Sequence, residues 1–274
     1  MSKLVPVPSG SMVPERDAGK HPILECVDLG ITFGGLKAVE DFNIMIGPTE
    51  ISGLIGPNGA GKTTVFNLLT KVYQPTRGTI LLDGRDTHGM NTMQVSRAGI
   101  ARTFQNIRLF NNLSVEDNVK VAMDANMKYS MWSGIFRLPR YWQEERSARE
   151  RALELLSLFS MEKLAGVKAG SLPYGAQRRL EIVRALATHP SLLLLDEPAA
   201  GMNPSETAEL MENIRKVRDT LQIAILLIEH DMNLVMNICE GICVLNFGRI
   251  IAKGTPAEIQ SNPAVIEAYL GKQG

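Results

Sequence analysis

The sequence has no excess of charge and no long apolar stretch. Lys and Arg together number 29, as do Asp and Glu, so no net field favours nucleic acid and we expect no nucleic-acid partner. No run approaches the ~18 apolar residues that a membrane span requires. Residues 1–21 lack the apolar core of a secretory signal, and their Pro, Ser, Gly and mixed charges predict a flexible tail over residues 1–22. Any link to a membrane therefore has to run through a partner.

Cysteine is also scarce. The chain has three, Cys26, Cys239 and Cys243, and this odd number without a signal indicates a reducing compartment rather than a disulfide framework. Cys239 and Cys243 are four residues apart, a spacing that would place them on one face of a helix. Because no third and fourth ligand lie nearby, we expect buried thiols instead of a metal site.

One glycine-rich stretch fits the phosphate-binding pattern G-x-x-x-x-G-K-[ST]. Glycines let the backbone turn so that successive N–H groups point at one anion, and the following helix adds its positive end. Lys62 would reach the terminal phosphates, and the Thr63 hydroxyl would ligate Mg²⁺. The residues expected to bind the nucleotide here are Gly56, Pro57, Asn58, Gly59, Ala60, Gly61, Lys62, Thr63 and Thr64.

The remaining patterns predict an α/β fold. Short apolar runs separated by glycine turns over residues 23–47 indicate a small antiparallel sheet. The apolar runs Leu192–Leu195 and Ile223–Ile228 are typical of buried parallel strands, and the stripe of Leu210, Ile214, Val217 and Leu221 predicts a helix between them. Residues 106–172 are expected to be mostly helical. A capping box at Thr255–Glu258 would start a short C-terminal helix.

Within the helical region, residues 128–144 are less regular. Four aromatic residues lie there beside two arginines: Trp132, Phe136, Tyr141, Trp142, Arg137 and Arg140. This composition suits either a membrane-proximal or partner-facing surface or a helical excursion that packs its own aromatic side chains, and the sequence leaves both open.

Three further polar sites follow or adjoin the predicted strands. Asp196 and Glu197 come directly after the Leu192–Leu195 strand, where α/β sheets bind ligands. Asp196 is placed to hold Mg²⁺ through its water shell, and Glu197 to polarise an attacking water. His230, after the Ile223–Ile228 strand, would reach the terminal phosphate. Gln105, where the core meets the helical region, would ligate Mg²⁺ and respond to movement of that region.

Residues 172–176 form a second candidate anion-binding site, at the N-terminus of a predicted helix. Its residues are Leu172, Pro173, Tyr174, Gly175 and Ala176, and Leu180, Val183 and Ala187 line one side of the helix. One chain does not need two such sites for one nucleotide, unless the second serves the nucleotide of another subunit.

In order and spacing, these elements resemble the ATP-binding subunit of ABC transporters over about residues 23–273. The resemblance implies a P-loop NTPase core with a parallel sheet, an antiparallel β subdomain and a helical signature subdomain at about residues 106–180. It assigns Phe33 to adenine stacking, Gly56–Thr63 to Walker A, Gln105 to the Q-loop, residues 172–176 to the signature and His230 to the switch. Leu192–Glu197 resembles Walker B, with Glu197 as its catalytic glutamate; Lys62, Gln105 and His230 would complete the catalytic set.

Several segments resemble, more closely, the subunit that serves high-affinity import of branched-chain amino acids. They are residues 102–110, 199–204 and 267–271, together with an insert around residues 127–145. Urea or amide import and lipopolysaccharide export use similar subunits and remain alternatives. A soluble GTPase would need an Asn-Lys-x-Asp motif, which is absent, and non-transport ABC proteins usually carry two cassettes or a long coiled-coil insert.

The resemblance implies ATP and Mg²⁺ as cofactors and three kinds of partner: a second ATPase subunit, membrane permeases and, indirectly, a periplasmic binding protein. The chain would then sit peripherally on the cytoplasmic face of the inner membrane. Three positions depart from the family pattern. Pro173 stands for a serine, Ala176 for a glutamine and Asn203 for an aspartate. We therefore expect that the ATP site completed by this signature is weakened while the chain's own Walker site is competent.

Overall fold

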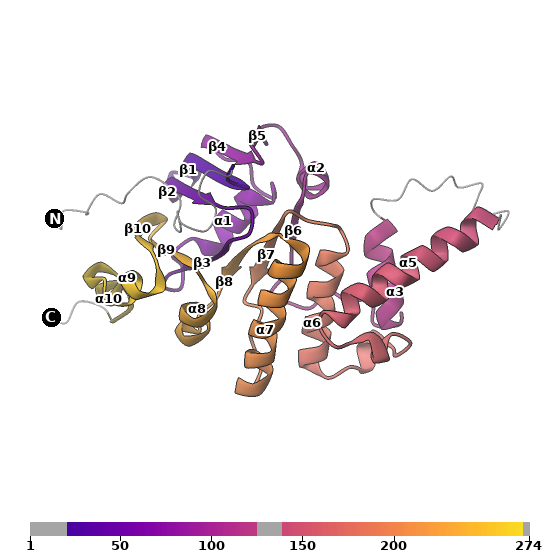
Figure 1. Ribbon diagram of the computed structural model, residues 1–274. Helices are drawn as coiled ribbons and strands as arrows, with labels where there is room; N and C mark the ends of the chain where they lie inside the picture. Colours follow the sequence, from indigo (N-terminus) through magenta and orange to yellow (C-terminus); the bar gives the residue numbers. More distant parts are fainter. Residues whose placement is uncertain (1–20, 125–138, 271–274) are drawn as a thin grey trace.

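The computed structural model describes residues 21–124 and 139–270 (Figure 1). The tail predicted for residues 1–22 falls almost entirely outside this range, as do residues 271–273 and the aromatic residues Trp132 and Phe136. The interpretation of the irregular segment therefore stays a prediction. Among the helices of the described residues, none is both long enough and apolar enough to cross a membrane.

A four-stranded antiparallel sheet forms from the first part of the chain, as its glycine-punctuated pattern predicts. Its strands, in spatial order, are β2 (Leu36–Ile46), β1 (Leu24–Phe33), β4 (Arg77–Leu82) and β5 (Arg85–Asp86). β1 and β2 are joined by Gly34 and Gly35, both at positive φ, which permits the tight turn that keeps Phe33 at the end of the sheet.

The second sheet carries the parallel strands. In spatial order they are β10 (Arg249–Gly254), β9 (Gly241–Asn246), β3 (Ile51–Ile55), β8 (Ala224–Ile228), β7 (Leu192–Asp196) and β6 (Ile100–Arg102). All neighbours pair in parallel except the β9–β10 hairpin at the edge. Every residue of β3, β7 and β8 is buried, as expected of strands covered on both faces. Their carboxyl ends therefore meet at one edge of the sheet.

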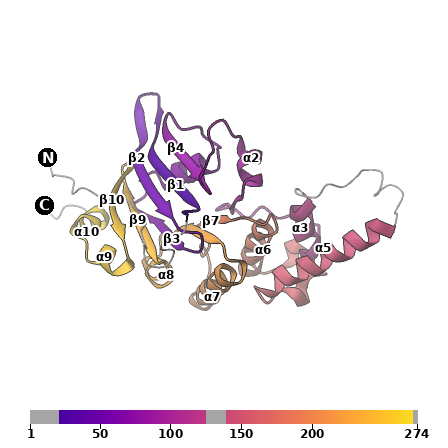
Figure 2. The ribbon, with the colours of Figure 1, turned by 45° about the horizontal axis from the view of Figure 1, so that its top comes forward.

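Helices cover this sheet, and a helical part of the molecule lies to one side of it. Those beside the sheets are α1 (Lys62–Leu69), α2 (Thr92–Arg97), α7 (Pro204–Leu221), α8 (Met232–Ile238), α9 (Pro256–Gln260) and α10 (Pro263–Leu270). The helical part comprises α3 (Val115–Asp124), α5 (Pro139–Ser157), α6 (Tyr174–Leu186) and the 3₁₀ turns Glu162–Leu164 and Ala169–Ser171. Figures 1 and 2 show α3 and α5 at the end remote from both termini, with α6 between them and the sheet. The predicted C-terminal helix is α9, where the Thr255 N–H donates to Glu258 Oε2 at 2.7 Å.

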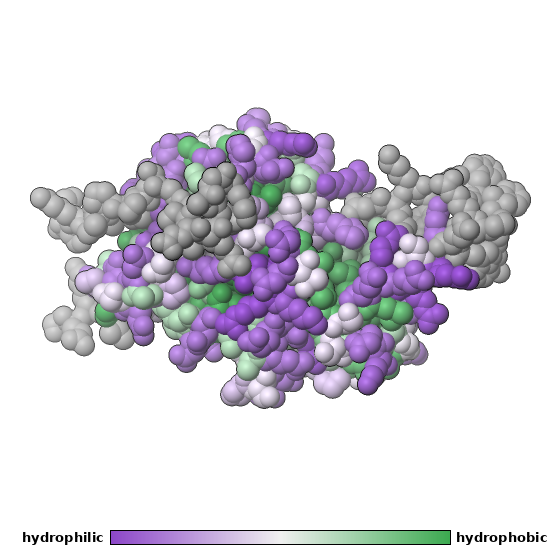
Figure 3. All heavy atoms as spheres, viewed as in Figure 1, coloured by the Kyte–Doolittle hydropathy of each residue, from purple (hydrophilic) through white to green (hydrophobic). Residues whose placement is uncertain are grey.

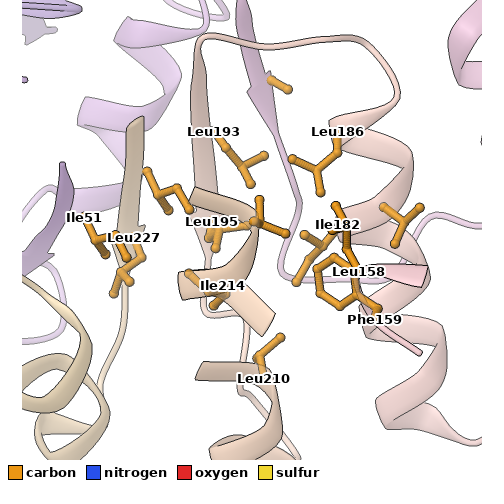
Figure 4. Packing of buried hydrophobic residues seen from close by; sticks show 14 of the residues in the cluster. Ile51, Leu158, Phe159, Ile182, Leu186, Leu193, Leu195, Leu210, Ile214 and Leu227 are labelled. Atoms are coloured by element: carbon orange, nitrogen blue, oxygen red, sulfur yellow. The ribbon is translucent and has the colours of Figure 1, made fainter. Parts of the chain in front are cut away.

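Alternate residues of the buried strands supply two hydrophobic clusters. Leu193 and Leu195 of β7 point toward α6 and α7, where they meet Ile214 in the larger cluster (Figure 4). Leu192 and Leu194 belong to the cluster under the antiparallel sheet. Successive side chains of a strand point to opposite faces of the sheet, so β7 contributes to both clusters. Burial of one leucine side chain stabilises the fold by about 1.5–3 kcal/mol. The stripe predicted for the helix after β7 is confirmed by the burial of Leu210, Ile214 and Val217.

Two expectations need correction. Cys239 and Cys243 do not share a helical face, because α8 ends at Ile238 and the chain then enters β9. All three cysteines are buried, as expected, and the described residues contain no metal-binding cluster of His, Cys, Asp and Glu. Helix in the 106–172 region begins only at Val115. The buried Asn118 side chain accepts from the Phe110 N–H at 3.0 Å and donates to the carbonyls of Phe110 and Ser114, which holds the preceding segment out of the helix.

Candidate functional site

The glycine-rich loop joins β3 to α1 at the carboxyl edge of the parallel sheet. A Cβ on Gly56 would lie 2.0 Å from the Leu245 carbonyl oxygen, so only glycine fits there. Gly61, the N-cap of α1, has φ 105°, a conformation that glycine adopts without strain. The loop thus has the turn and the exposed helix start that the sequence predicts for binding an anion. Of its side chains, those of Asn58 and Thr63 are exposed.

Lys62 lies across this loop rather than extending into solvent. Its Nζ donates to the carbonyl of Gly56 at 2.7 Å and to that of Pro57 at 3.0 Å, and the residue is buried. Burial lowers the pKa of Lys62, while the carboxylates of Glu197 and Asp196 act in the opposite direction. The ammonium is therefore held within electrostatic reach of both acidic residues, although they are far away in the sequence.

Glu197 is the point where three segments meet. Its Oε2 accepts from Gln105 Nε2 at 2.8 Å, and its Oε1 lies 2.8 Å from His230 Nε2. Glu197 itself has φ 49°, in the left-handed region, and its N–H donates to the Ile228 carbonyl at 2.9 Å. Such a conformation is costly for a residue with a Cβ and is typical of functional sites. The predicted polar residues are thus brought together on one carboxylate.

Asp196 pairs with an arginine to which sequence reasoning gave no role. Arg102 donates to Asp196 Oδ2 at 2.7 Å and to Asn67 Oδ1 at 2.7 Å, and both side chains of the ion pair are more than nine-tenths buried. The guanidinium also lies 5.3 Å from the centre of the Phe104 ring, and Arg108 lies 4.1 Å from the same ring. The only sequence signal was the position of Arg102 three residues before Gln105.

The oxygen-bearing side chains at this edge suit a hard divalent cation. Thr63 offers a hydroxyl, Gln105 an amide and Asp196 a carboxylate, which are the donor types that Mg²⁺ prefers when most of its shell is water and phosphate. The buried carboxylate of Asp196 also requires nearby positive charge, which Arg102 and Lys62 supply in part. The residues therefore fit Mg²⁺ bound together with a phosphate better than a site formed by protein ligands alone.

A buried glutamate beside the site was also missed. Glu229 Oε1 accepts from the Ala199 N–H at 2.8 Å and Oε2 from the His230 N–H at 3.2 Å. Burial raises the pKa of Glu229, and the charge of Glu197 adds to that effect. This carboxylate joins the loop after β7 to the loop after β8, so it fixes Glu197 and His230 relative to each other.

Phe33 is the last residue of β1. It is 42% exposed, and its ring packs edge-on against Tyr73, with centroids 5.2 Å apart and an interplanar angle of 73°. Sequence reasoning did not find Tyr73, since a single tyrosine soon after α1 carries no pattern. The exposed ring has the form of a stacking platform.

Residues 172–176 start helix α6 but are not brought to the chain's own phosphate loop. In the described part of the chain, no hydrogen bond or ion pair joins them to residues 56–63. Pro173 is the N-cap residue and provides no side-chain cap bond. Pro173 and Tyr174 are exposed, whereas Ala176 is buried in the larger hydrophobic cluster. Within the described residues, the exposed start of α6 is therefore not bonded to the phosphate loop of the same chain.

Two protein families match parts of this chain. Residues 39–200 match the family described as ABC transporter, and residues 249–274 match the family described as branched-chain amino acid ATP-binding cassette transporter.

Two curated relatives carry the name high-affinity branched-chain amino acid transport ATP-binding protein. BraF of Pseudomonas aeruginosa is 47% identical and LivG of Escherichia coli K12 is 48% identical, each over 252 residues, 92% of this chain and 99% of the relative. Among solved structures, the ADP conformation of an ATP-binding cassette of an ABC transporter matches with a TM-score of 0.80. That protein is 28% identical, and the match covers 92% of this chain and 100% of that one.

Proposed function

This chain belongs to the ATP-binding, ATP-hydrolysing subunits of ABC transporters, and on that premise we propose that Glu197 directs water to bound ATP in a branched-chain amino acid importer. The observation that supports this role is the contact of Glu197 with both Gln105 and His230 beside the phosphate loop. A carboxylate fixed from two sides is suited to orient one water molecule for attack.

The chain's residues divide the work of phosphoryl transfer. The amides of the 56–63 loop and the Lys62 ammonium bind the phosphates and stabilise charge that develops on them. Mg²⁺, held with Thr63, Gln105 and Asp196, supplies further charge neutralisation when bound. His230 contacts the terminal phosphate, and Phe33 stacks on adenine. Binding ATP and positioning it are the main contributions, because the reaction needs little covalent help from the protein.

A second ATPase subunit completes the proposed site. Pro173 and Tyr174, at the exposed start of α6, would contact nucleotide bound to that partner, and the partner's equivalent segment would contact ATP on this chain's loop. Permease subunits would bind near the segment after Gln105, with Arg108, Phe110 and Asn111 as contacts. Phe110 is 47% exposed, which supports such a surface. These partners would hold the chain at the cytoplasmic face of the inner membrane and receive substrate from a periplasmic binding protein.

The catalytic proposal is tested with Glu197→Gln in the full-length chain assembled with its transporter partners. We expect ATP affinity to change little and turnover to fall by about two orders of magnitude or more, because the amide cannot accept a proton or orient water equally well. A matched control is Glu209→Gln, an exposed carboxylate on α7 that pairs with Arg179. Normal turnover by Glu197→Gln would reject the assignment.

The substrate proposal rests on the match of residues 249–274 and on the two relatives, so it needs a separate test. The chain is reconstituted with the permease and binding-protein subunits encoded beside it, and uptake of leucine, isoleucine and valine is measured against urea and short amides. ATP-dependent uptake of branched-chain amino acids alone supports the proposal. Uptake of urea or amides, or stimulation of ATPase activity by lipopolysaccharide instead, would replace it with one of the alternatives.

A further inference from the structure

Arg178 is the largest side chain that is fully buried in the described part of the molecule. It lies on the second turn of α6, four residues after the exposed Tyr174. A guanidinium has five N–H donors and keeps its charge, so its burial is tolerated only where acceptors surround it. The hydrogen-bond acceptors around Arg178 therefore show which parts of the chain it holds together.

The acceptors of Arg178 are mostly backbone carbonyls at the edge of the parallel sheet. One terminal nitrogen donates to the carbonyls of Asp196 at 2.5 Å and Glu197 at 2.8 Å, and Nε donates to that of Pro198 at 3.3 Å. The other terminal nitrogen donates to the carbonyl of Phe104, to that of Gln105 at 3.4 Å, and to Glu181 Oε2 at 2.7 Å.

These carbonyls belong to the two loops whose side chains meet at the candidate catalytic centre. One loop carries Glu197, the other carries Gln105, and the two side chains contact each other. The guanidinium is planar and rigid, so it fixes the two backbone segments at a set separation. Glu181 lies three residues further along α6, and its carboxylate supports the guanidinium by accepting from it. Burial raises the pKa of Glu181, and the charge of Arg178 opposes that shift.

We propose that Arg178 is a positioning residue through which helix α6 sets the places of Glu197 and Gln105. Contact of a partner with Pro173 or Tyr174 at the start of α6 would be transmitted, one helical turn away, to the backbone of both catalytic loops. This connection begins at Pro173 and Tyr174, on the surface proposed to contact another subunit, and it ends at the Glu197 carboxylate, which is proposed to orient water. The inference rests on the proposed role of Glu197.

Arg218 provides a matched control for this proposal. It is also a buried arginine, 7% exposed, and it donates to Glu240 Oε1 at 2.7 Å and to the Thr49 carbonyl at 3.5 Å. It lies on α7, and its contacts are at the opposite end of the parallel strands from Glu197. A lysine at either position keeps the charge and loses the planar fork, so both variants are expected to lose similar stability.

The experiment compares Arg178→Lys and Arg218→Lys in the assembled transporter by thermal unfolding and ATPase kinetics. We expect Arg178→Lys to lower kcat about 10- to 100-fold with KM for ATP within about threefold, and Arg218→Lys to leave kcat within about twofold. A purely structural role predicts equal losses of stability and no difference in kcat. Equal kcat values for the two variants, with Glu197→Gln inactive, would overturn the role of Arg178 alone.

A second variant decides the matter if Arg178→Lys does not fold. Glu181→Gln keeps α6 and the guanidinium but weakens the support of the fork, and we expect kcat to fall about three- to tenfold at unchanged KM. Wild-type kcat in Glu181→Gln would then overturn the proposal. If instead Glu197→Gln turns over ATP normally, the proposed function fails, and the positioning role fails with it.

Discussion

Replacement of Gly175 by alanine tests how the start of α6 is held against α7. Alanine in place of glycine inside a helix normally stabilises a protein by about 0.5–1 kcal/mol, because glycine loses more backbone freedom on folding. In this protein a Cβ on Gly175 would lie 2.7 Å from Glu206 Oε1 and 3.1 Å from its Cδ. The glutamate would have to move.

Glu206 is already engaged where it lies. Its Oε2 accepts from the Asn203 N–H at 3.0 Å, and its own N–H donates to Asn203 Oδ1 at 3.0 Å, which forms the capping box of α7. Displacing the carboxylate loses about 1 kcal/mol of capping. We therefore expect Gly175→Ala to give no gain in the free energy of unfolding, or a loss of up to about 1 kcal/mol, in place of the usual gain.

The measurement is a double-mutant cycle by urea unfolding, followed by circular dichroism, with Gly175→Ala, Glu206→Ala and the double variant. In the Glu206→Ala background the cap bond is already lost, so Gly175→Ala should stabilise by about 0.5–1 kcal/mol. The expected coupling free energy, the difference between these two effects of Gly175→Ala, is about 0.5–2 kcal/mol. A stabilisation by Gly175→Ala that is the same in both backgrounds would refute the argument that Glu206 requires glycine at this position.

Three further predictions concern the signature, the thiols and the dependence of stability on pH. Pro173→Ser should raise stability by about 0.5–1 kcal/mol, since the hydroxyl caps α6, and should preserve or raise the ATPase activity of the assembled complex; about a tenfold loss would contradict it. Burial raises the pKa of the Cys243 thiol to about 12, and it also raises the pKa of Cys26 and Cys239. A thiol-specific disulfide reagent should therefore react with the unfolded chain and not with the native protein. Rapid reaction at about pH 8 would show this to be wrong. Because burial raises the pKa of Glu229, its contribution to the free energy of unfolding is present below about pH 4.3 and is lost as pH rises through the folded pKa. The unfolding free energy of the wild type minus that of Glu229→Gln should fall as the pH is raised above about 4.3 in urea titrations, and a constant or growing difference would reject that origin.

Several large apolar side chains are exposed on the described surface. Figure 3 shows hydrophilic residues over most of the visible face, with smaller apolar areas between them. Among the exposed apolar residues are Phe110 and Tyr174, on the two segments proposed to contact the permeases and the second ATPase. Such exposed aromatic residues at otherwise polar surfaces are frequent at interfaces.

The sequence alone determined the local pieces of this protein. The 56–63 loop, the Leu192–Leu195 strand and the capping box at Thr255 depend on short-range spacing, and residues that lie close together in the sequence carry the whole signal. The helical face expected for Cys239 and Cys243 was wrong because a fixed spacing of four residues is helical only if the chain between stays helical. A buried strand takes over there.

Only the tertiary structure decided which distant groups meet. The contact of Gln105 and His230 with Glu197, the pairing of Arg102 with Asp196 and the fork of Arg178 all join residues far apart in the sequence. Arginines in particular give little local signal, because a charged side chain is usually exposed and its partners are chosen by the fold. The buried Arg178 donates mostly to backbone carbonyls. Because every residue has a backbone carbonyl, the sequence does not indicate which of them will accept from an arginine.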